Sequence, residues 1–188
     1  MKDIFKLGGI LMVVTVIAAS GLAGVYQVTQ PRILEQKKKE LQNALTLALP
    51  GAADDSIYPV EENGRVLYYK AYSAPDTTKL VGFAFITQGA GYSSVIETMV
   101  GVDTSGQIIG IKVMSQVETP GLGTKIEEIR YGESEPWFQQ QFIGKSAERL
   151  AVDKDGGEIS SITGATISSR ATANSIVEGY RRFRENRE

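Results

Sequence analysis

The sequence contains no cysteine and no histidine among its 188 residues, and only one tryptophan and six prolines. Without cysteine there are no disulfides, no thiol nucleophiles and no cysteine-ligated iron–sulfur clusters. Without histidine, the usual zinc sites and the serine–histidine hydrolase triad are excluded as well. The formal net charge is only -2, so composition gives no argument for nucleic-acid binding. A chain with so few reactive side chains is either a binding module or depends on a bound cofactor.

Charged residues are also missing between Lys6 and Arg32, and residues 7–26 are mostly apolar. About twenty such residues span the roughly 30 Å of hydrocarbon in a membrane. Small residues at 18–24 also suit the cleavage site of a signal peptide, which is the competing interpretation. A retained anchor is preferred because the run is longer than the roughly 7–15 apolar residues of a signal peptide.

The charges on either side of this run leave its orientation open. Lys2 and Lys6 precede the run, whereas Arg32 and the triple lysine at 37–39 follow it. Positive-inside counting favours a cytoplasmic C-terminal part, but large domains that follow an early anchor are often exported regardless of such charges.

Beyond the apolar run, residue patterns predict an α+β fold. Pro31 is expected to end the membrane segment, and residues 32–49 form a helical pattern that Pro50 and Gly51 stop. Alternating apolar residues then predict four consecutive strands, at 66–72, 81–87, 95–103 and 108–114. A short helix near 135–142 and a closing helix at 167–184 follow.

The expected organisation has three parts. These are a transmembrane anchor at 1–30, a membrane-proximal helix at 31–50, and a domain at 51–188 in which helices cover an antiparallel sheet. No strand–GxGxxG–helix unit for a dinucleotide is present.

The most informative segment is residues 161–170, SITGATISSR, which gathers hydroxyl residues around one glycine just before the closing helix. The start of a helix presents free backbone N–H groups and the positive end of the helix dipole, so it suits a phosphate. Gly164 permits backbone angles that are closed to other residues, and Ala165 keeps the surface clear. An ordinary helix N-cap is the alternative interpretation, since serine and threonine are favoured there.

Three separated segments carry a resemblance to a known family: residues 91–103 (GYSSVIETMVGVD), 118–125 (ETPGLGTK) and 163–166 (TGAT). In this order and spacing the chain resembles the FMN-binding domains that carry a covalent flavin, and among them the G subunits of Rnf electron-transport complexes. The resemblance implies that a flavin transferase uses FAD as donor and attaches FMN, through its phosphate, to Thr166. The family pattern usually has aspartate three positions before Thr163, where this chain has Ser160.

The resemblance also indicates which residues surround the FMN. The expected cofactor-binding residues are Thr163, Gly164, Ala165 and Thr166, together with Glu118, Thr119, Gly121, Leu122, Gly123 and Lys125. Glu118 would bond a ribityl hydroxyl or only cap the amides of residues 119–121, and Lys125 would offset flavin charge or lie solvated at a helix start. Tyr92, Met99 and Trp137 are candidates for an apolar ring site or for simple core positions.

The function implied is that of an electron-transfer subunit, without catalytic residues of its own, in a membrane complex that couples ferredoxin:NAD⁺ oxidoreduction to Na⁺ or H⁺ translocation. The partners implied are the other complex subunits and a flavin transferase. The chain would be a single-pass protein of the inner (cytoplasmic) membrane with its flavin domain on the extracytoplasmic side. The alternative is a membrane-anchored extracytoplasmic ligand-binding or sensor domain without a redox role.

Overall fold

The computed structural model describes residues 2–73 and 79–187, which divide into two compact units, residues 1–40 and residues 41–188. The first unit consists of one helix, the greater part of α1 (Lys2–Ala48). In the described residues α1 is the one helix long and apolar enough to cross a membrane, judged by its length and composition. The apolar run at residues 7–26 lies inside it, with every side chain exposed.

The helix does not stop at Pro31, which lies inside α1. Proline has no N–H to donate to the carbonyl four residues earlier, so one helical hydrogen bond is lost there. The helix-forming residues on both sides keep the backbone helical. The membrane-proximal helix expected at 31–50 is therefore the continuation of α1, and its side chains become buried only from Ala44 onward.

The second unit is built on one antiparallel sheet with the strand order β1-β2-β3-β4-β5. Its strands are β1 (Ala52–Glu62), β2 (Arg65–Ser73), β3 (Leu80–Ala90), β4 (Val95–Val102) and β5 (Ile108–Ser115). The last four agree with the four strands that the alternating pattern predicts. The alternating pattern does not predict β1, because Pro59 and two adjacent aspartates interrupt it. Pro59 is tolerated because β1 is an edge strand.

The two faces of the sheet bury two separate hydrophobic clusters. The last turns of α1 pack on one face, where Leu45 and Ala48 meet Ala84 and Met99. The backbone of α1 approaches the sheet closely at the cross-strand pair Gly101 and Gly110, because a Cβ on either glycine would overlap the Ala48 carbonyl. The end of α1 therefore lies directly on the backbone of β4 and β5.

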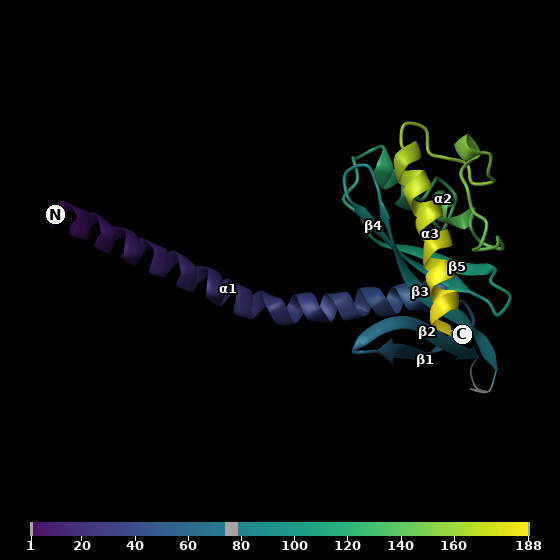
Figure 1. The fold of residues 1–188 in the computed structure, drawn as a ribbon, viewed down its shortest axis with the longest axis horizontal. Helices are drawn as coiled ribbons and strands as arrows, with labels where there is room; N and C mark the ends of the chain where they lie inside the picture. Colours follow the sequence, from purple (N-terminus) through teal and green to yellow (C-terminus); the bar gives the residue numbers. More distant parts are fainter. Residues whose placement is uncertain (1, 74–78, 188) are drawn as a thin grey trace. The chain divides into compact units, whose positions relative to one another are not determined.

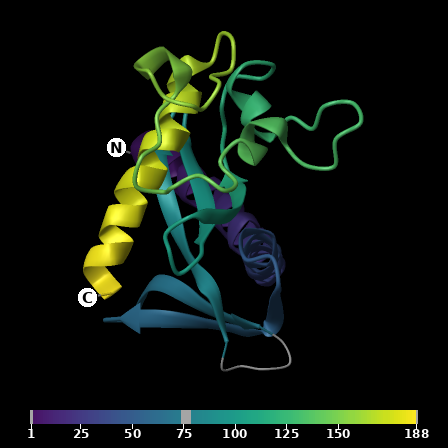
Figure 2. The ribbon, with the colours of Figure 1, turned by 90° about the vertical axis from the view of Figure 1, so that its right-hand side faces the viewer.

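The other face is covered by α3 (Thr166–Arg187) and by the irregular segment that precedes it. Phe183 of α3 packs on Tyr68, Phe83 and Phe85 with ring centroids 5.1–5.3 Å apart. Figures 1 and 2 show the segment between β5 and α3 gathered at the N-terminal end of α3. This segment contains η1 (Gly123–Glu127), α2 (Trp137–Gln140) and η2 (Asp153–Asp155). The α+β fold with helices over an antiparallel sheet is confirmed.

Candidate functional site

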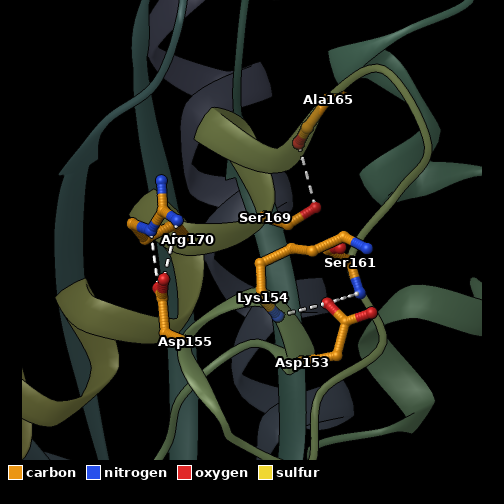
Figure 3. A network of polar contacts seen from close by, with 7 residues as sticks. All are labelled: Asp153, Lys154, Asp155, Ser161, Ala165, Ser169 and Arg170. Carbon is orange, nitrogen blue, oxygen red and sulfur yellow. Dashed lines mark hydrogen bonds and ion pairs between the residues drawn. The ribbon is translucent and has the colours of Figure 1, made fainter.

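The residues expected at the FMN site meet at the N-terminal end of α3, where a tight turn at residues 162–165 leads into the helix. The turn is closed by the Ala165 amide, which donates to the Ile162 carbonyl at 2.9 Å. Gly164 has a φ of 79°, in the left-handed region that glycine adopts without strain. The Ser169 hydroxyl accepts from the Ile162 amide at 3.0 Å. It also donates to the Ala165 carbonyl at 3.0 Å, as Figure 3 shows. One side chain thus fastens both ends of the turn.

Thr166 is the first residue of α3 and is half-buried, whereas Thr163 is exposed. Within the described part of the chain, no acceptor is found for the amides of Thr166, Ile167 and Ser168. The positive end of the helix dipole and these free donors lie at the Thr166 backbone. A singly charged phosphodiester on the Thr166 hydroxyl would be stabilised there.

The buried carboxylate of Glu118 connects this helix start to the β3–β4 turn. It accepts from the amides of Tyr92, Ser93 and Ser94 at 2.9–3.1 Å. The Ser94 hydroxyl donates at 3.2 Å and the Ser168 hydroxyl of α3 at 2.5 Å. These five donors already fill the roughly four lone-pair sites of a carboxylate. Glu118 therefore organises the site through protein donors, at amides other than those of residues 119–121.

Burial alone would raise the pKa of Glu118, but its hydrogen bonds outweigh burial and lower the pKa below the ordinary value. The Ser168 hydroxyl contributes most among these bonds, followed by the amides of Ser93, Ser94 and Tyr92. The side chain is consequently ionised at neutral pH. Its negative charge is spread over donors from two segments that are far apart in the sequence.

The loop at 119–125 packs directly against the 162–165 turn. A Cβ on Gly164 would lie 3.1 Å from Leu122 Cδ2, and one on Gly123 would lie 2.6 Å from Glu118 Oε2 and 2.7 Å from Ser168 Oγ. Gly123 is thus a close-packing position. Gly121 has a φ of 73° with open space around it, and its amide donates to the Thr124 hydroxyl at 3.0 Å. The Thr119 hydroxyl pairs with that of Ser93 at 3.2 Å.

A cavity of about 550 Å³ opens beside Thr163. Lys125 and Trp137 line it, with Glu128, Arg130, Gln141 and residues 160–163 completing the wall. The Trp137 indole N–H donates to Glu128 at 3.2 Å, and the Arg130 guanidinium lies 3.6 Å from the indole ring centroid. The volume of this cavity is in the range of known cofactor pockets. The charged and aromatic groups of its wall are the Trp137 indole, the cations Lys125 and Arg130, and the Glu128 carboxylate.

The ten residues expected at the site are all found in this region, in different roles. Thr163 and Lys125 line the cavity, Thr166 begins α3, and Glu118 with Gly123 supports the helix start. Met99 does not belong to the site, because it lies in the cluster on the opposite face of the sheet. Tyr92 is exposed and donates its amide to Glu118.

Several residues that support the site are not indicated by the sequence alone. Ser168 and Ser169 lie in the hydroxyl-rich segment, and their helical spacing after Thr166 was the available signal. Gln141 gave no signal, although its amide group bonds both the N–H and the carbonyl of Ser160, at 2.8 and 3.2 Å. Asp153 and Arg170 also support the turn, through contacts that spacing does not reveal.

Two family models match this chain. The model of the FMN-binding domain matches residues 91–180, and that of the RnfG N-terminal region matches residues 1–47. The G subunit of the ion-translocating oxidoreductase complex of Shewanella amazonensis is 31% identical, over 90% of this chain and 83% of its own length. The corresponding G subunit of Methanosarcina acetivorans is also 31% identical, with 93% and 92% covered.

This chain belongs to the G-subunit family of ion-translocating oxidoreductase complexes. Another relative, the G subunit of the Na(+)-translocating ferredoxin:NAD(+) oxidoreductase complex of Acetobacterium woodii, is 32% identical over 93% of this chain and 89% of its own length. With its apolar helix α1, this member of the G-subunit family is a membrane protein that contains an FMN-binding domain.

Two solved structures show the same fold. NqrC of Shewanella oneidensis matches 81% of this chain and 98% of its own, with a TM-score of 0.61 and 20% identity. The C subunit of the Na(+)-translocating NADH-quinone reductase from Parabacteroides distasonis has a TM-score of 0.56 and 21% identity, over 81% of this chain and 96% of its own. This chain therefore shares its fold with these two proteins.

Proposed function

We propose that this protein is the FMN-carrying electron-transfer subunit of a membrane complex that couples ferredoxin:NAD⁺ oxidoreduction to Na⁺ or H⁺ translocation, with FMN bound covalently to Thr166. The observation that carries the proposal is the position of Thr166, which combines a hydroxyl, a helix start with free amides and a nearby cavity of about 550 Å³. Membership of the G-subunit family supplies the complex and the redox role.

Attachment requires a flavin transferase and FAD. The Thr166 oxygen forms a bond to the phosphorus of the FMN half, the pyrophosphate P–O bond breaks, AMP leaves and the hydroxyl proton is released. The residues around Thr166 fit the product, because the phosphodiester keeps one negative charge for the free amides of α3 to stabilise. Bound FMN supplies the ability to accept and give single electrons.

The cavity walls suit the rest of the cofactor. Trp137 offers an aromatic face, while Lys125 and Arg130 place positive charge around the space beside Thr163. Cations near a flavin favour its electron-rich reduced form, because they lower the energy of added negative charge. The chain would thereby hold one flavin at a fixed place in an electron path, tethered against loss.

The domain is proposed to lie on the extracytoplasmic side of the cytoplasmic membrane, with the N-terminus inside. Lys2 and Lys6 supply an inside bias for the N-terminal end of the span. The triple lysine at 37–39 opposes it, but lies within α1 several residues beyond the apolar run.

The acceptor assignment is tested by co-expressing the full chain with a flavin transferase. The wild type is expected to fluoresce under ultraviolet light on a denaturing gel and to show the added mass of FMN in intact mass spectrometry. Thr166→Ala should abolish both signals, Thr166→Ser should retain part of them, and Thr163→Ala should reduce them less than Thr166→Ala. Full labelling of Thr166→Ala would disprove the assignment. An unlabelled wild type would favour a sensor domain.

A further inference from the structure

Two acidic residues of η2 hold the two sides of the 162–165 turn, as Figure 3 shows. Before the turn, the Ser161 amide donates to Asp153 Oδ1 at 3.1 Å. After the turn, the Arg170 guanidinium donates to both carboxylate oxygens of Asp155, at 2.6 and 2.7 Å. This two-pronged pairing fixes the orientation of a guanidinium as well as its distance. A three-residue element thus connects the segment before Thr163 to the second turn of α3.

The backbone on either side of η2 is held by the core of the domain. Val152 and Ile159, which form a β-bridge with each other, are buried in the core of the domain. The Asp153 amide donates to the Ile159 carbonyl at 2.8 Å, and the Gly157 amide donates to the Val152 carbonyl at 2.9 Å. The backbone that carries both carboxylates is therefore anchored independently of the turn that they hold.

We propose that Asp153 and Asp155 are positioning residues for flavin attachment: they fix the 162–165 turn and the start of α3 so that Thr166 is presented to the flavin transferase. The inference rests on the proposed attachment at Thr166. Group transfer depends steeply on the placement of the attacking atom, and a misplacement of about 1 Å can cost on the order of 100-fold in rate. Thr163 and Gly164 at the tip of the turn are exposed, so contacts on either side of the turn are needed to keep one geometry.

The charged side chains of Asp153 and Asp155 can hold the turn without contributing much to the stability of the whole domain. The hydrogen bond and the charge of Arg170 lower the pKa of Asp155, and hydrogen bonds from Ser161 lower that of Asp153. Both side chains are therefore ionised at neutral pH. They are also exposed, and exposed ion pairs contribute little to the stability of the whole fold. Their removal should loosen the turn while the domain stays folded.

Flavin incorporation into the purified full-length chain, measured with FAD and a flavin transferase, tests the inference. Asp155→Asn and Arg170→Gln are each expected to lower kcat/KM of the acceptor about tenfold, by the sensitivity of group transfer to position. The charge swap Asp155→Arg with Arg170→Asp should recover most of the loss. Glu148→Gln is the matched control, because it removes an ion pair to the far end of α3 at Arg184 (3.2 Å).

Amide hydrogen exchange supplies a readout that does not depend on the transferase. In Asp153→Ala the amides of Ser161 and Ala165 should exchange faster than in the wild type, while the sheet amides keep their protection. Unchanged exchange at these amides, or single variants labelled at the wild-type rate, would overturn the positioning role alone. A swap that recovers nothing would overturn it too, and would indicate direct contact of these side chains with the transferase. Labelling of Thr166→Ala would instead overturn the acceptor assignment.

Discussion

At the scale of single residues, Glu118 is the side chain on which the geometry of the site depends most. Its carboxylate receives donors from the β3–β4 turn and from α3, so it joins two segments that approach each other only in the folded state. A neutral amide in its place would present N–H groups toward N–H donors. Buried donors that lose their acceptor each cost about 1–3 kcal/mol.

Glu118→Gln should therefore lower the free energy of unfolding by about 3 kcal/mol at neutral pH, the upper end of the cost of one unsatisfied buried group. Chemical denaturation of the full-length protein in detergent measures the loss. Glu133→Gln, at an exposed glutamate of the same domain, is the control and should change little. Equal stability of the two variants would contradict the organising role of the Glu118 carboxylate.

The same carboxylate predicts a pH dependence. Because folding lowers the pKa of Glu118, its contribution to stability is complete above the ordinary glutamate value of about 4.3 and is lost as the pH falls through the folded value. The stability difference between the wild type and Glu118→Gln should thus shrink below about pH 4. Unfolding curves recorded from neutral pH to pH 3 give the free energy of unfolding of both proteins as a function of pH. The two values should converge at low pH. A constant difference would contradict the predicted role of the Glu118 carboxylate.

At the scale of elements, the contact between the end of α1 and the sheet depends on glycine. A Cβ on Gly101 would overlap the carbonyl of Ala48, and backbone cannot move aside as a flexible side chain can. Gly101→Ala is expected to cost about 1–3 kcal/mol, the usual range for overpacking. The melting temperature should fall by roughly 5 °C, since 1 kcal/mol corresponds to about 2–4 °C in a domain of this size.

Gly24→Ala is the matched control for this substitution. Gly24 also lies in a regular element, but no atom comes within 4 Å of a Cβ placed there. The control should melt at the wild-type temperature or slightly above it, because alanine favours helix over glycine. If Gly101→Ala has the same melting temperature as Gly24→Ala, the backbone of α1 does not contact the sheet at the pair Gly101 and Gly110.

Most elements of this fold follow from residue patterns, and the exceptions have identifiable causes. The period of apolar residues gave β2 to β5 and α3 to within a few residues, because burial of one face imposes that period. The strand β1 was missed, since proline and acidic residues are unusual in strands and are tolerated there by the edge position. The course of α1 through Pro31 was missed because local rules make proline a helix end.

The residues of the candidate site likewise include some that the sequence indicates and some that it does not. The hydroxyl-rich segment and the loop at 118–125 could be recognised, since each concentrates unusual residues in a short stretch. The bonds of Glu118 to Ser94 and Ser168 could not, because they join positions 24 and 50 residues away. The support of the 162–165 turn by η2 is likewise a product of tertiary folding. The sequence therefore indicates the position of the candidate site, but not the tertiary contacts that fix its geometry.

At the scale of the whole molecule, topology decides where electrons enter and leave. If the N-terminus is inside, alkaline phosphatase fused after Glu188 should be active, and a green fluorescent protein exported by the same route should remain dark. These reporters read opposite sides of the membrane, so together they give a positive signal for either orientation. The reverse pattern would place the flavin in the cytoplasm and would contradict the proposed electron path.

The single tryptophan of the chain has an optical consequence. Trp137 lines the cavity beside Thr163, and no second indole exists anywhere in the sequence. Tryptophan emits at wavelengths that flavins absorb, so an isoalloxazine ring bound in this cavity, as proposed, would quench the tryptophan fluorescence. The emission of the protein would then dim in proportion to the fraction of molecules that carry the cofactor. Because each molecule has one tryptophan donor and one flavin acceptor, tryptophan fluorescence would report the fraction of molecules that carry flavin, in the native protein and without any added dye.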